Sequence, residues 1–414
     1  MTSVDVFAGS SGSLGYVGQA HFTRNRGSVS TTFIYAPGYL AAGGTSIDPA
    51  LPLVSGAQYQ GGLFGAFTDS APDRWGRNLI EKAERIRARN EGVSPRQLDD
   101  LDFLLGVSDD TRQGALRFRF PEHEEFLGEP SRVPPLVSLP ELLRASDELD
   151  SGGDSSIAVK QLLDTGTTGL GGARPKASVR LEGGDLAIAK FPDAGDKWDV
   201  MAWESTALDL LESCGICTPR RRLVQVGNRN VLVLRRFDRT NEGQRIGYIS
   251  AMTATGSMDG QSRDYVEIVE AMRDLSPSLE RDHHEIFARV VASVALGNTD
   301  DHLRNHGFLV ERGAWKLSPA FDVNPNPDVT RRRSTSIMGA DTFPEEASAL
   351  LDFAEECNLR LAAAREIIGN ITGALSQWKQ QARKNQIREG EISLMAESIS
   401  LRLEAVIKAC QSWM

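Results

Sequence analysis

The sequence predicts an α+β fold in which a β-rich N-terminal part is followed by a mostly helical C-terminal half. Residues 1–65 contain short apolar alternations separated by Gly, Ser and Thr, the pattern of strands joined by turns. Residues 155–235 contain a second group of alternating segments around a glycine-rich turn. From about residue 260 onward, apolar residues recur mainly at helical spacing.

Helix starts in the first part of the chain are signalled by a serine with a proline or an acidic residue in the first turn. They occur at residues 70–73, 94–97 and 138–141. The first helix is expected to run to about Asn90, and the second is expected to stop at Gly106.

The middle of the chain combines strands with one helix. The strand candidates are 179–181, 186–191, 222–226 and 231–234. Between them, Val200–Ser213 has helical periodicity. Farther along, Ile286–Leu296 is apolar nearly all round, which predicts a buried helix, and 344–412 indicates several amphipathic helices.

Composition bounds the class of protein. The chain has 414 residues, of which 40% are apolar and 25% charged, as in ordinary soluble globular proteins of two or three domains. We predict domains at 1–135, 136–234 and 235–414. The net charge of -10 argues against nonspecific nucleic-acid binding by the whole surface. No signal-like or membrane-spanning stretch is evident, and four cysteines suggest no disulfide framework, so a reducing cytoplasm is expected.

Three polar residues in the C-terminal half point to phosphoryl transfer. Asp300 and Asn305 have the spacing of the Asp and Asn in the catalytic loop of protein kinases. Asp322 follows a strand-like stretch at 314–317, where kinases keep a metal-binding Asp. We assign Asp300 as the group that orients the acceptor hydroxyl and takes its proton. Asn305 and Asp322 are assigned as magnesium ligands.

Candidate nucleotide contacts lie upstream of these residues. Gly171 and Gly172 belong to a glycine-rich turn whose N–H groups could approach phosphates, although it matches neither the protein-kinase nor the Walker pattern. Lys190 ends a strand, and Glu204 on the next helix is its expected partner, which would orient the ammonium toward ATP. Taken alone, such a pair is more often solvated. The downstream order of Asp, Asn and Asp favours the functional interpretation.

Further contacts are expected from residues near the ends of these segments. Arg235 and Phe237 follow an apolar strand, where a kinase hinge presents backbone groups to adenine; a buried strand and turn without a ligand is the alternative. His302 and Arg304 are expected to contact phosphate or nucleotide, with a hydrogen-bonded structural imidazole as the alternative for the histidine. Residues 331–335 follow Asp322, where kinases place an activation segment, and their arginine run is expected to be solvated, or to dock a phosphate or an acidic substrate.

These segments together resemble the HipA-type serine/threonine protein kinases, the toxins of bacterial HipA–HipB toxin–antitoxin pairs. The resemblance is carried by residues 61–77, 170–176, 189–192, 236–239, 250–252, 298–307 and 317–325. It implies a two-lobed protein-kinase-like fold with an extra N-terminal subdomain, and the use of ATP and Mg²⁺ on a protein substrate. It also implies a small HipB-like antitoxin through which the chain meets DNA. Family substrates include aminoacyl-tRNA synthetases.

One position departs from the family pattern. The family often carries an autophosphorylated Ser just before Leu-Gly-Gly-Ala, whose modification switches the kinase off, and here that position is Gly169. Thr167 and Thr168 lie just upstream and are candidate substitutes.

Two other functions stay open. A small-molecule phosphotransferase of kinase fold could use a similar Asp–Asn loop, although the long N-terminal subdomain favours a protein kinase. A catalytically weak kinase could act only as an antitoxin-bound corepressor. The presence of Lys190, Glu204, Asp300, Asn305 and Asp322 together argues against this second alternative.

Overall fold

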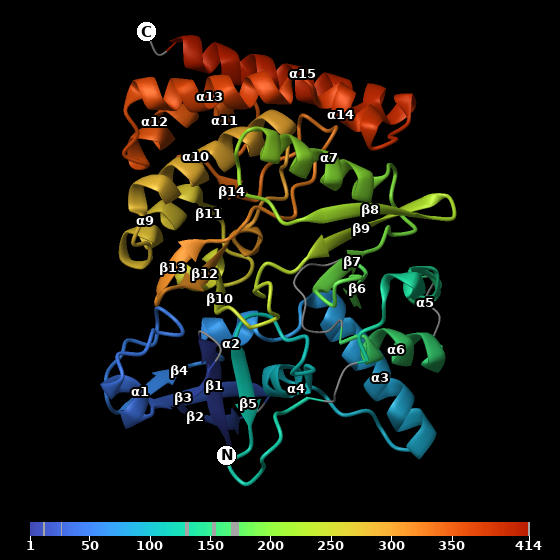
Figure 1. The fold of residues 1–414 in the computed structure, drawn as a ribbon, viewed down its shortest axis with the longest axis vertical. Coiled ribbons are helices and arrows are strands. Elements are labelled where there is room, and N and C mark those ends of the chain that lie inside the picture. The colour runs from blue at the N-terminus through green and yellow to red at the C-terminus, as the bar shows by residue number, and fades with distance from the viewer. Residues whose placement is uncertain (11–12, 26, 129–131, 151–154, 167–173, 413–414) are drawn as a thin grey trace. The chain divides into compact units, whose positions relative to one another are not determined.

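The computed structural model of the chain describes residues 1–10, 13–25, 27–128, 132–150, 155–166 and 174–412 (Figure 1). The chain divides into two compact units. Unit 1 comprises residues 1–195, 224–249 and 309–313, and unit 2 comprises residues 196–223, 250–308 and 314–414. Both units contain helices and strands, which confirms the predicted α+β class. The three predicted domain ranges remain a prediction.

Unit 1 begins with a five-stranded antiparallel sheet in the order β4-β3-β2-β1-β5. In β3, Phe33 and Tyr35 are buried and Ile34 between them is exposed, as expected for a strand with one face on a core. The strands expected within residues 1–65 are therefore present. The bounds of the five strands of this sheet are β1 (Thr2–Ser10), β2 (Ser13–Asn25), β3 (Ser28–Tyr35), β4 (Ala57–Gln60) and, outside that range, β5 (Leu116–Arg119).

The helices of unit 1 follow local capping signals. α3 begins after Asp73, whose side chain accepts a hydrogen bond from the N–H of Gly76. The predicted start at 94–97 is wrong, because Asp99 and Asp102 form a reciprocal capping box that starts α4 at Asp100. The bounds are α1 (Pro37–Ala41), α2 (Gly65–Asp69), α3 (Arg74–Glu91), α4 (Asp100–Gly106), η1 (Leu136–Ser138), α5 (Leu139–Asp150) and α6 (Ser156–Asp164).

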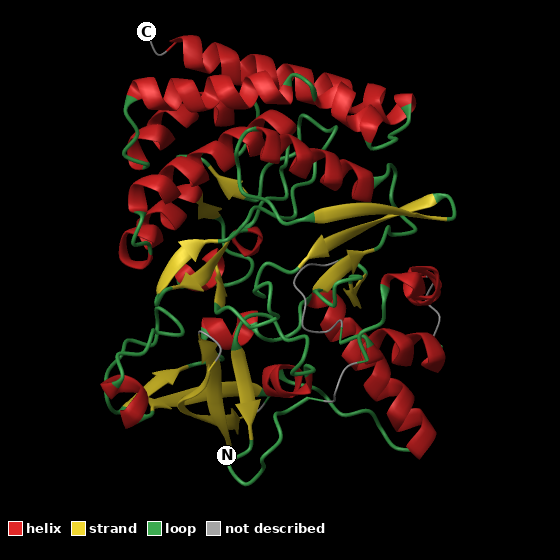
Figure 2. Cartoon of the chain, in the orientation of Figure 1, coloured by secondary structure: helices red, strands yellow, loops and turns green. Residues whose placement is uncertain are grey.

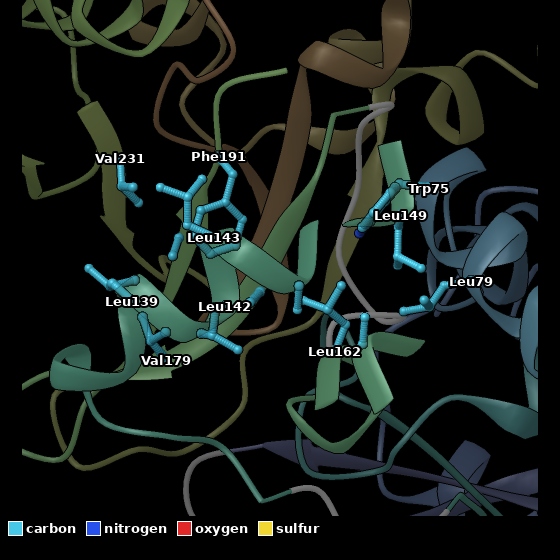
Figure 3. Close-up of a cluster of buried hydrophobic side chains, with 14 of the residues drawn as sticks. Trp75, Leu79, Leu139, Leu142, Leu143, Leu149, Leu162, Val179, Phe191 and Val231 are labelled. Carbon is cyan, nitrogen blue, oxygen red and sulfur yellow. The ribbon is translucent and has the colours of Figure 1, made fainter. Parts of the chain in front are cut away.

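A second sheet has the strand order β6-β7-β9-β8. Apolar side chains from its strands and from α3, α5 and α6 form one buried cluster, which includes Leu142, Leu162, Val179 and Phe191 (Figure 3). Burial of each such side chain contributes roughly 1.5–3 kcal/mol, so this core fixes the strand end that carries Lys190. The bounds are β6 (Lys176–Arg180), β7 (Leu186–Lys190), β8 (Arg221–Val226) and β9 (Arg229–Arg235).

Unit 2 is mostly helical (Figure 2). Its α10 packs against α13 and α15, and the predicted buried helix at Ile286–Leu296 is the C-terminal part of α10. The predicted helix Val200–Ser213 is confirmed as α7. The other helices are α8 (Ala251–Ala254), α9 (Tyr265–Leu275), α11 (Glu345–Ser348), α12 (Leu350–Glu356), α14 (Trp378–Lys384) and η3 (Leu303–Asn305), with α10 (Leu279–Leu296), α13 (Leu361–Leu375) and α15 (Glu389–Ser412).

Short strands complete unit 2 and connect the two units along the chain. β11 pairs with β14 in parallel, and β13 precedes the segment that contains Asp322. The chain passes from one unit to the other after Gly195, within β8, β10 and β12, and again after Gly313. The bounds are β10 (Tyr248–Ser250), β11 (Arg263–Asp264), β12 (Gly307–Glu311), β13 (Ala314–Leu317) and β14 (Thr335–Ser336). Among the described residues, no helix has the length and apolar character needed to cross a membrane.

Candidate active site

A tight turn at the end of α10 begins the loop that carries the predicted catalytic residues. Gly297 has a left-handed backbone with φ 68°, which glycine adopts at little cost. A Cβ at this position would lie 3.1 Å from Nε of Arg402 and 3.2 Å from the carbonyl oxygen of Asn326, so space also favours glycine. The next N–H, that of Asn298, donates to the carbonyl of Ser293 at 2.9 Å.

Asp300 and Asn305 are joined through the main chain of this loop. Asn305 is buried, and its Nδ2 donates to the main-chain oxygen of Asp300 at 3.1 Å. The Asp300 side chain is exposed. Since Nδ2 of Asn305 is used within the loop, Oδ1 is the atom of this amide that could bind a metal ion. The loop thus presents a carboxylate to solvent from a buried support.

Asp322 lies in the segment after β13 and has a left-handed backbone with φ 59°. This conformation costs a non-glycine residue of order 1–3 kcal/mol and is found mainly where the surroundings enforce it, as at functional sites. Nδ2 of Asn324 donates to Oδ1 of Asp322 at 3.2 Å, and the N–H of Asn324 donates to Oδ1 of Asn298 at 3.1 Å. The Asp322 segment is therefore tied to the loop after α10. The sequence analysis missed Asn298 and Asn324, although both lie inside motifs that carry the family resemblance.

The donor set fits a magnesium ion. Mg²⁺ binds oxygen ligands and usually takes one or two protein carboxylates, with substrate phosphates and water completing its shell. Asp322 offers a carboxylate, and Asn305 offers an amide oxygen from the neighbouring loop. Both belong to unit 2, as does Asp300.

Asp301, the residue after Asp300, is buried and holds the loop from within. Its carboxylate accepts hydrogen bonds from Tyr265 (2.5 Å), Ser293 (2.9 Å) and Nε2 of His306 (2.9 Å). Burial alone would raise the pKa of Asp301, but the interaction with His306 and the donated hydrogen bonds hold this pKa below its usual value. Asp301 is therefore not a solvated acidic residue, because three side-chain donors take the place of water around its carboxylate.

Arg333 is also buried, so the expectation that residues 331–333 form a solvated run is wrong for its third member. The Arg333 guanidinium pairs with Glu346 at 2.6 Å and donates to Ser293 at 2.8 Å. Glu346 also pairs with Arg402 of α15. Arg331 and Arg332 remain exposed. The buried pair fixes the segment that follows Asp322 against the helices of unit 2.

The histidines of the loop differ in environment. His306 is a hydrogen-bonded structural imidazole, because its Nε2 contacts the Asp301 carboxylate. His302 is half-buried at the start of η3. Arg304 pairs with the exposed Asp259 at 2.7 Å. The predicted nucleotide contacts of His302 and Arg304 remain predictions.

In unit 1, Lys190 ends β7 opposite Lys176 of β6, and both side chains are buried. Lys176 pairs with Asp73, the N-cap of α3. Glu204 is fully buried on α7 of unit 2. The predicted pairing of Lys190 with Glu204 joins residues of different units and remains a prediction.

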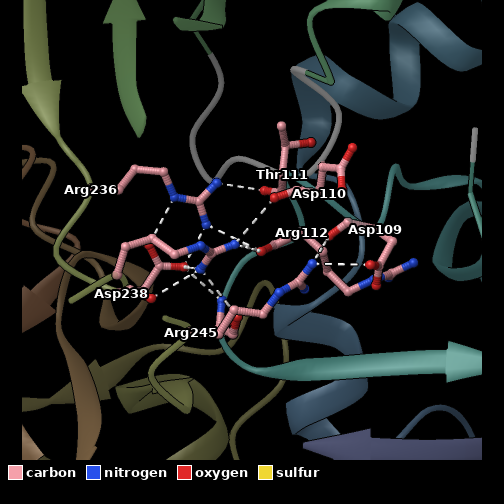
Figure 4. A network of polar contacts seen from close by, with 9 residues as sticks. Asp109, Asp110, Thr111, Arg112, Arg236, Asp238 and Arg245 are labelled. Atoms are coloured by element: carbon pink, nitrogen blue, oxygen red, sulfur yellow. Dashed lines mark hydrogen bonds and ion pairs between the residues drawn. The ribbon is translucent and has the colours of Figure 1, made fainter. Parts of the chain in front are cut away.

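The predicted hinge residues flank a buried ionic network (Figure 4). Asp238 accepts from Arg236 (2.5 Å), Arg239 (2.8 Å) and the N–H of Gly114 (2.8 Å). The two arginines also donate to main-chain oxygens of residues 110–114. Burial would raise the pKa of Asp238, but these arginines hold it below its usual value. The network explains the charged motif as a brace for the 109–114 segment.

Arg235 and Phe237 lie on either side of Arg236. Nε of Arg235 donates to Asp185 at 2.7 Å, so its guanidinium is held by the neighbouring strand connection. The Phe237 ring lies 6.2 Å from the ring of Tyr248, measured between centroids. Their proposed contact with adenine remains a prediction. The other phosphate-loop candidates, Gly171, Gly172, Thr167 and Thr168, lie outside the described residues.

The chain is similar to known proteins over nearly all of its length. Residues 14–119 match the model of the HipA N-terminal domain, and residues 168–378 match that of the HipA-like C-terminal domain. The fold resembles HipA of Shewanella oneidensis, solved with HipB and operator DNA, with a TM-score of 0.64 and 16% identity over 98% of this chain and 97% of that one.

Two further similarities are more limited. A Haemophilus influenzae protein whose name proposes a kinase is 26% identical over 144 residues, which is 30% of this chain and 42% of that protein. The Helicobacter pylori proinflammatory kinase CtkA aligns with a TM-score of 0.41 and 16% identity over 59% of this chain and 94% of that one. The C-terminal family model alone spans just over half of the chain and includes Asp300, Asn305 and Asp322, and the N-terminal model matches a separate stretch before it, so the chain belongs to the HipA family.

Proposed function

We propose that the chain is an ATP- and magnesium-dependent serine/threonine protein kinase and the toxin of a bacterial toxin–antitoxin pair. The observation that carries this proposal is the exposed Asp300 carboxylate, which stands on a loop fastened by Asn305 and tied to the Asp322 segment. Membership of the HipA family supports it.

In this function, Asp300 orients the acceptor hydroxyl and takes its proton as the new bond to phosphorus forms. Asn305 and Asp322 are the oxygen donors that hold magnesium. ATP supplies the phosphoryl group, and magnesium neutralises charge on its phosphates. Asp301 is assigned no contact with ATP or magnesium. Its proposed role is to hold the loop that carries Asp300.

The nucleotide contacts complete the proposed site. Lys190, oriented by Glu204, is proposed to meet the phosphates, with Gly171 and Gly172 of the glycine-rich turn. Arg235 and Phe237 are proposed to present backbone groups to adenine. His302 and Arg304, which lie in the proposed catalytic loop, are proposed to contact phosphate or nucleotide.

The proposed partners follow from the family. The Shewanella HipA was solved together with HipB and operator DNA, and we propose a HipB-like antitoxin for this chain, with DNA reached only through it. We propose a cytoplasmic location and a protein substrate of the translation apparatus, such as an aminoacyl-tRNA synthetase. Thr167 and Thr168 are proposed as autophosphorylation sites.

The test is phosphate transfer from labelled ATP to proteins of a host-cell lysate, with and without magnesium. Asp300→Asn is the inactive variant, and Asp328→Asn is a matched control, because Asp328 is an exposed aspartate of the same unit that hydrogen-bonds only locally. We expect Asp300→Asn to lower the transfer rate by about 10²- to 10⁴-fold, the usual contribution of a positioned general base.

A labelled protein band that needs magnesium and Asp300 would support the protein kinase and identify its target. Label in a small molecule rather than a protein would favour the small-molecule phosphotransferase. Absence of any transfer, with antitoxin binding retained, would favour the corepressor.

A further inference from the structure

A hydroxyl group of unit 2 lies against the Asp300 carboxylate. Oγ of Ser334 donates to Oδ1 of Asp300 at 3.3 Å, and both side chains are exposed. A general base must lie within hydrogen-bond reach of the hydroxyl whose proton it takes. A serine of the chain itself therefore occupies the position of an acceptor hydroxyl.

The main chain on both sides of Ser334 is fixed to the same loop. The N–H of Ser334 donates to the carbonyl of Thr299 at 2.8 Å. Oγ1 of Thr335, which is buried, donates to the carbonyl of Asp301 at 2.7 Å. On the other side, Arg333 is held by its buried pair with Glu346. Contacts of three consecutive residues, 333–335, thus hold the main chain that carries the Ser334 hydroxyl. The position of this hydroxyl does not depend on the side-chain rotamer of Ser334 alone.

We propose that Ser334 is a phosphorylation site that the chain modifies itself, with Asp300 of the same molecule as the base. This inference rests on the proposed kinase function and adds an acceptor and a form of regulation to it. Oγ of Ser334 attacks the γ-phosphorus of ATP, and the Oγ–P bond forms as the bond from the γ-phosphorus to the β–γ bridging oxygen breaks. ADP leaves with the electron pair of that bond. The hydroxyl proton passes to Asp300 and then to water.

The product would close the site to other acceptors. Phosphoserine carries a charge of about -1.5 to -2 at neutral pH, and here it would stand beside the Asp300 carboxylate. The exposed Arg331 lies nearby in the chain and can donate charge-assisted hydrogen bonds to its phosphate oxygens, whereas Arg332 already pairs with Asp341. The phosphate group on Ser334 would then keep an external hydroxyl away from Asp300, both by its volume and by its negative charge. Such a switch would not depend on Thr167 or Thr168.

The test uses the purified full chain with ATP and magnesium at several protein concentrations, and dephosphorylated casein as the external acceptor. Trypsin cleavage after Arg333 and Arg360 releases the peptide 334–360, in which fragmentation locates the phosphate. Ser334→Ala removes the acceptor, and Ser334→Thr keeps a hydroxyl. Ser336→Ala is the matched control, because Oγ of Ser336 donates to Asp264 rather than to Asp300.

We expect phosphate on Ser334 in the unchanged chain and in Ser336→Ala, phosphate on the new Thr in Ser334→Thr, and none at this position in Ser334→Ala or Asp300→Asn. The rate should be first order and independent of protein concentration. Preincubation with ATP should lower transfer to casein by about 10- to 100-fold, part of what a positioned base contributes, and Ser334→Ala should not show this decline.

Three results would overturn the proposal. Transfer to casein without phosphate on Ser334 would refute the inference and leave the proposed kinase function standing. Phosphate on Ser334 of Asp300→Asn mixed with the unchanged chain would show transfer between molecules. No transfer to either acceptor would refute the inference and the kinase function together.

Discussion

Two buried ionic networks, one in each unit, differ in what their central carboxylate supports. In unit 1, Asp238 accepts from Arg236 and from the N–H of Gly114, and the network ends on main-chain oxygens. In unit 2, Asp301 accepts from three buried side chains, and the residue before it, Asp300, is exposed. The first network fixes a segment of main chain, whereas the second supports the loop that carries the exposed Asp300, the proposed base.

A buried carboxylate surrounded by charged or polar donors can therefore support either the main chain alone or a candidate functional site. Both carboxylates have pKa values lowered by nearby donors against the effect of burial. Asp301 differs from Asp238 because the residue before it, Asp300, is an exposed Asp. In this pair of adjacent residues, the buried carboxylate holds the loop and the exposed carboxylate is proposed to act on the substrate. Loss of either network should lower stability, but only loss of the Asp301 network should lower the rate of phosphate transfer. Mutations should therefore separate the two networks.

The largest effect is expected from Asp301→Ala. The substitution leaves Tyr265, Ser293 and His306 buried without their shared acceptor, and breaking a buried charged contact of this kind costs about 3–5 kcal/mol. Denaturant unfolding would measure the loss. Transfer per folded molecule should also fall by at least about tenfold, because the base Asp300 loses its fixed position. Ordinary transfer by the folded variant would show that Asp300 needs no buried support.

Asp238→Ala is the matched change in unit 1. It leaves Arg236 and Arg239 buried beside one another, and we expect a comparable loss of stability of about 3–5 kcal/mol. Transfer at saturating ATP, corrected for the folded fraction, should be retained. If the rate fell as it does in Asp301→Ala, the motif around Asp238 would contribute to the chemistry and the proposed distinction would fail.

A pH series sharpens the same comparison within unit 2. The folded-state pKa of Asp301 lies below its unfolded value of about 3.9. The stabilisation from this carboxylate is therefore fully present above about pH 4 and is lost as the pH falls below it toward the folded pKa. The difference in free energy of unfolding between the unchanged chain and Asp301→Asn should shrink below about pH 4. A constant difference down to about pH 3 would contradict this assignment.

Residue spacing was enough to select the proposed site residues but not the buried residues that support them. Asp300, Asn305 and Asp322 could be selected because their order and spacing follow from the reaction. Nothing in the sequence separated Asp301 from Asp300, since the donors to Asp301 come from remote segments that meet only in the fold. Ser334 was missed for the same reason.

Local signals predicted the helices with similar limits. The periodicity of Val200–Ser213 gave both ends of α7, which begins after Asp199 as its N-cap and is buried on nearly all sides. The signal at 94–97 was misleading, because a stronger capping pair lay five residues downstream at Asp99 and Asp102. Burial within the arginine run 331–333 could not be predicted from the sequence. Arg333 is buried and pairs with Glu346, whereas its neighbour Arg332 is exposed.

The smallest effect is expected at the surface pair of Arg304 and Asp259. This pair is largely exposed, so Arg304→Ala and Asp259→Ala should each change the free energy of unfolding by less than about 1 kcal/mol. If Arg304 contacts phosphate, as proposed, only Arg304→Ala should raise the KM for ATP, and the rise should weaken at high salt. Equal KM values for the two variants would remove Arg304 from the nucleotide site. It would then be, unlike Arg236, an arginine of a surface pair with little effect on stability.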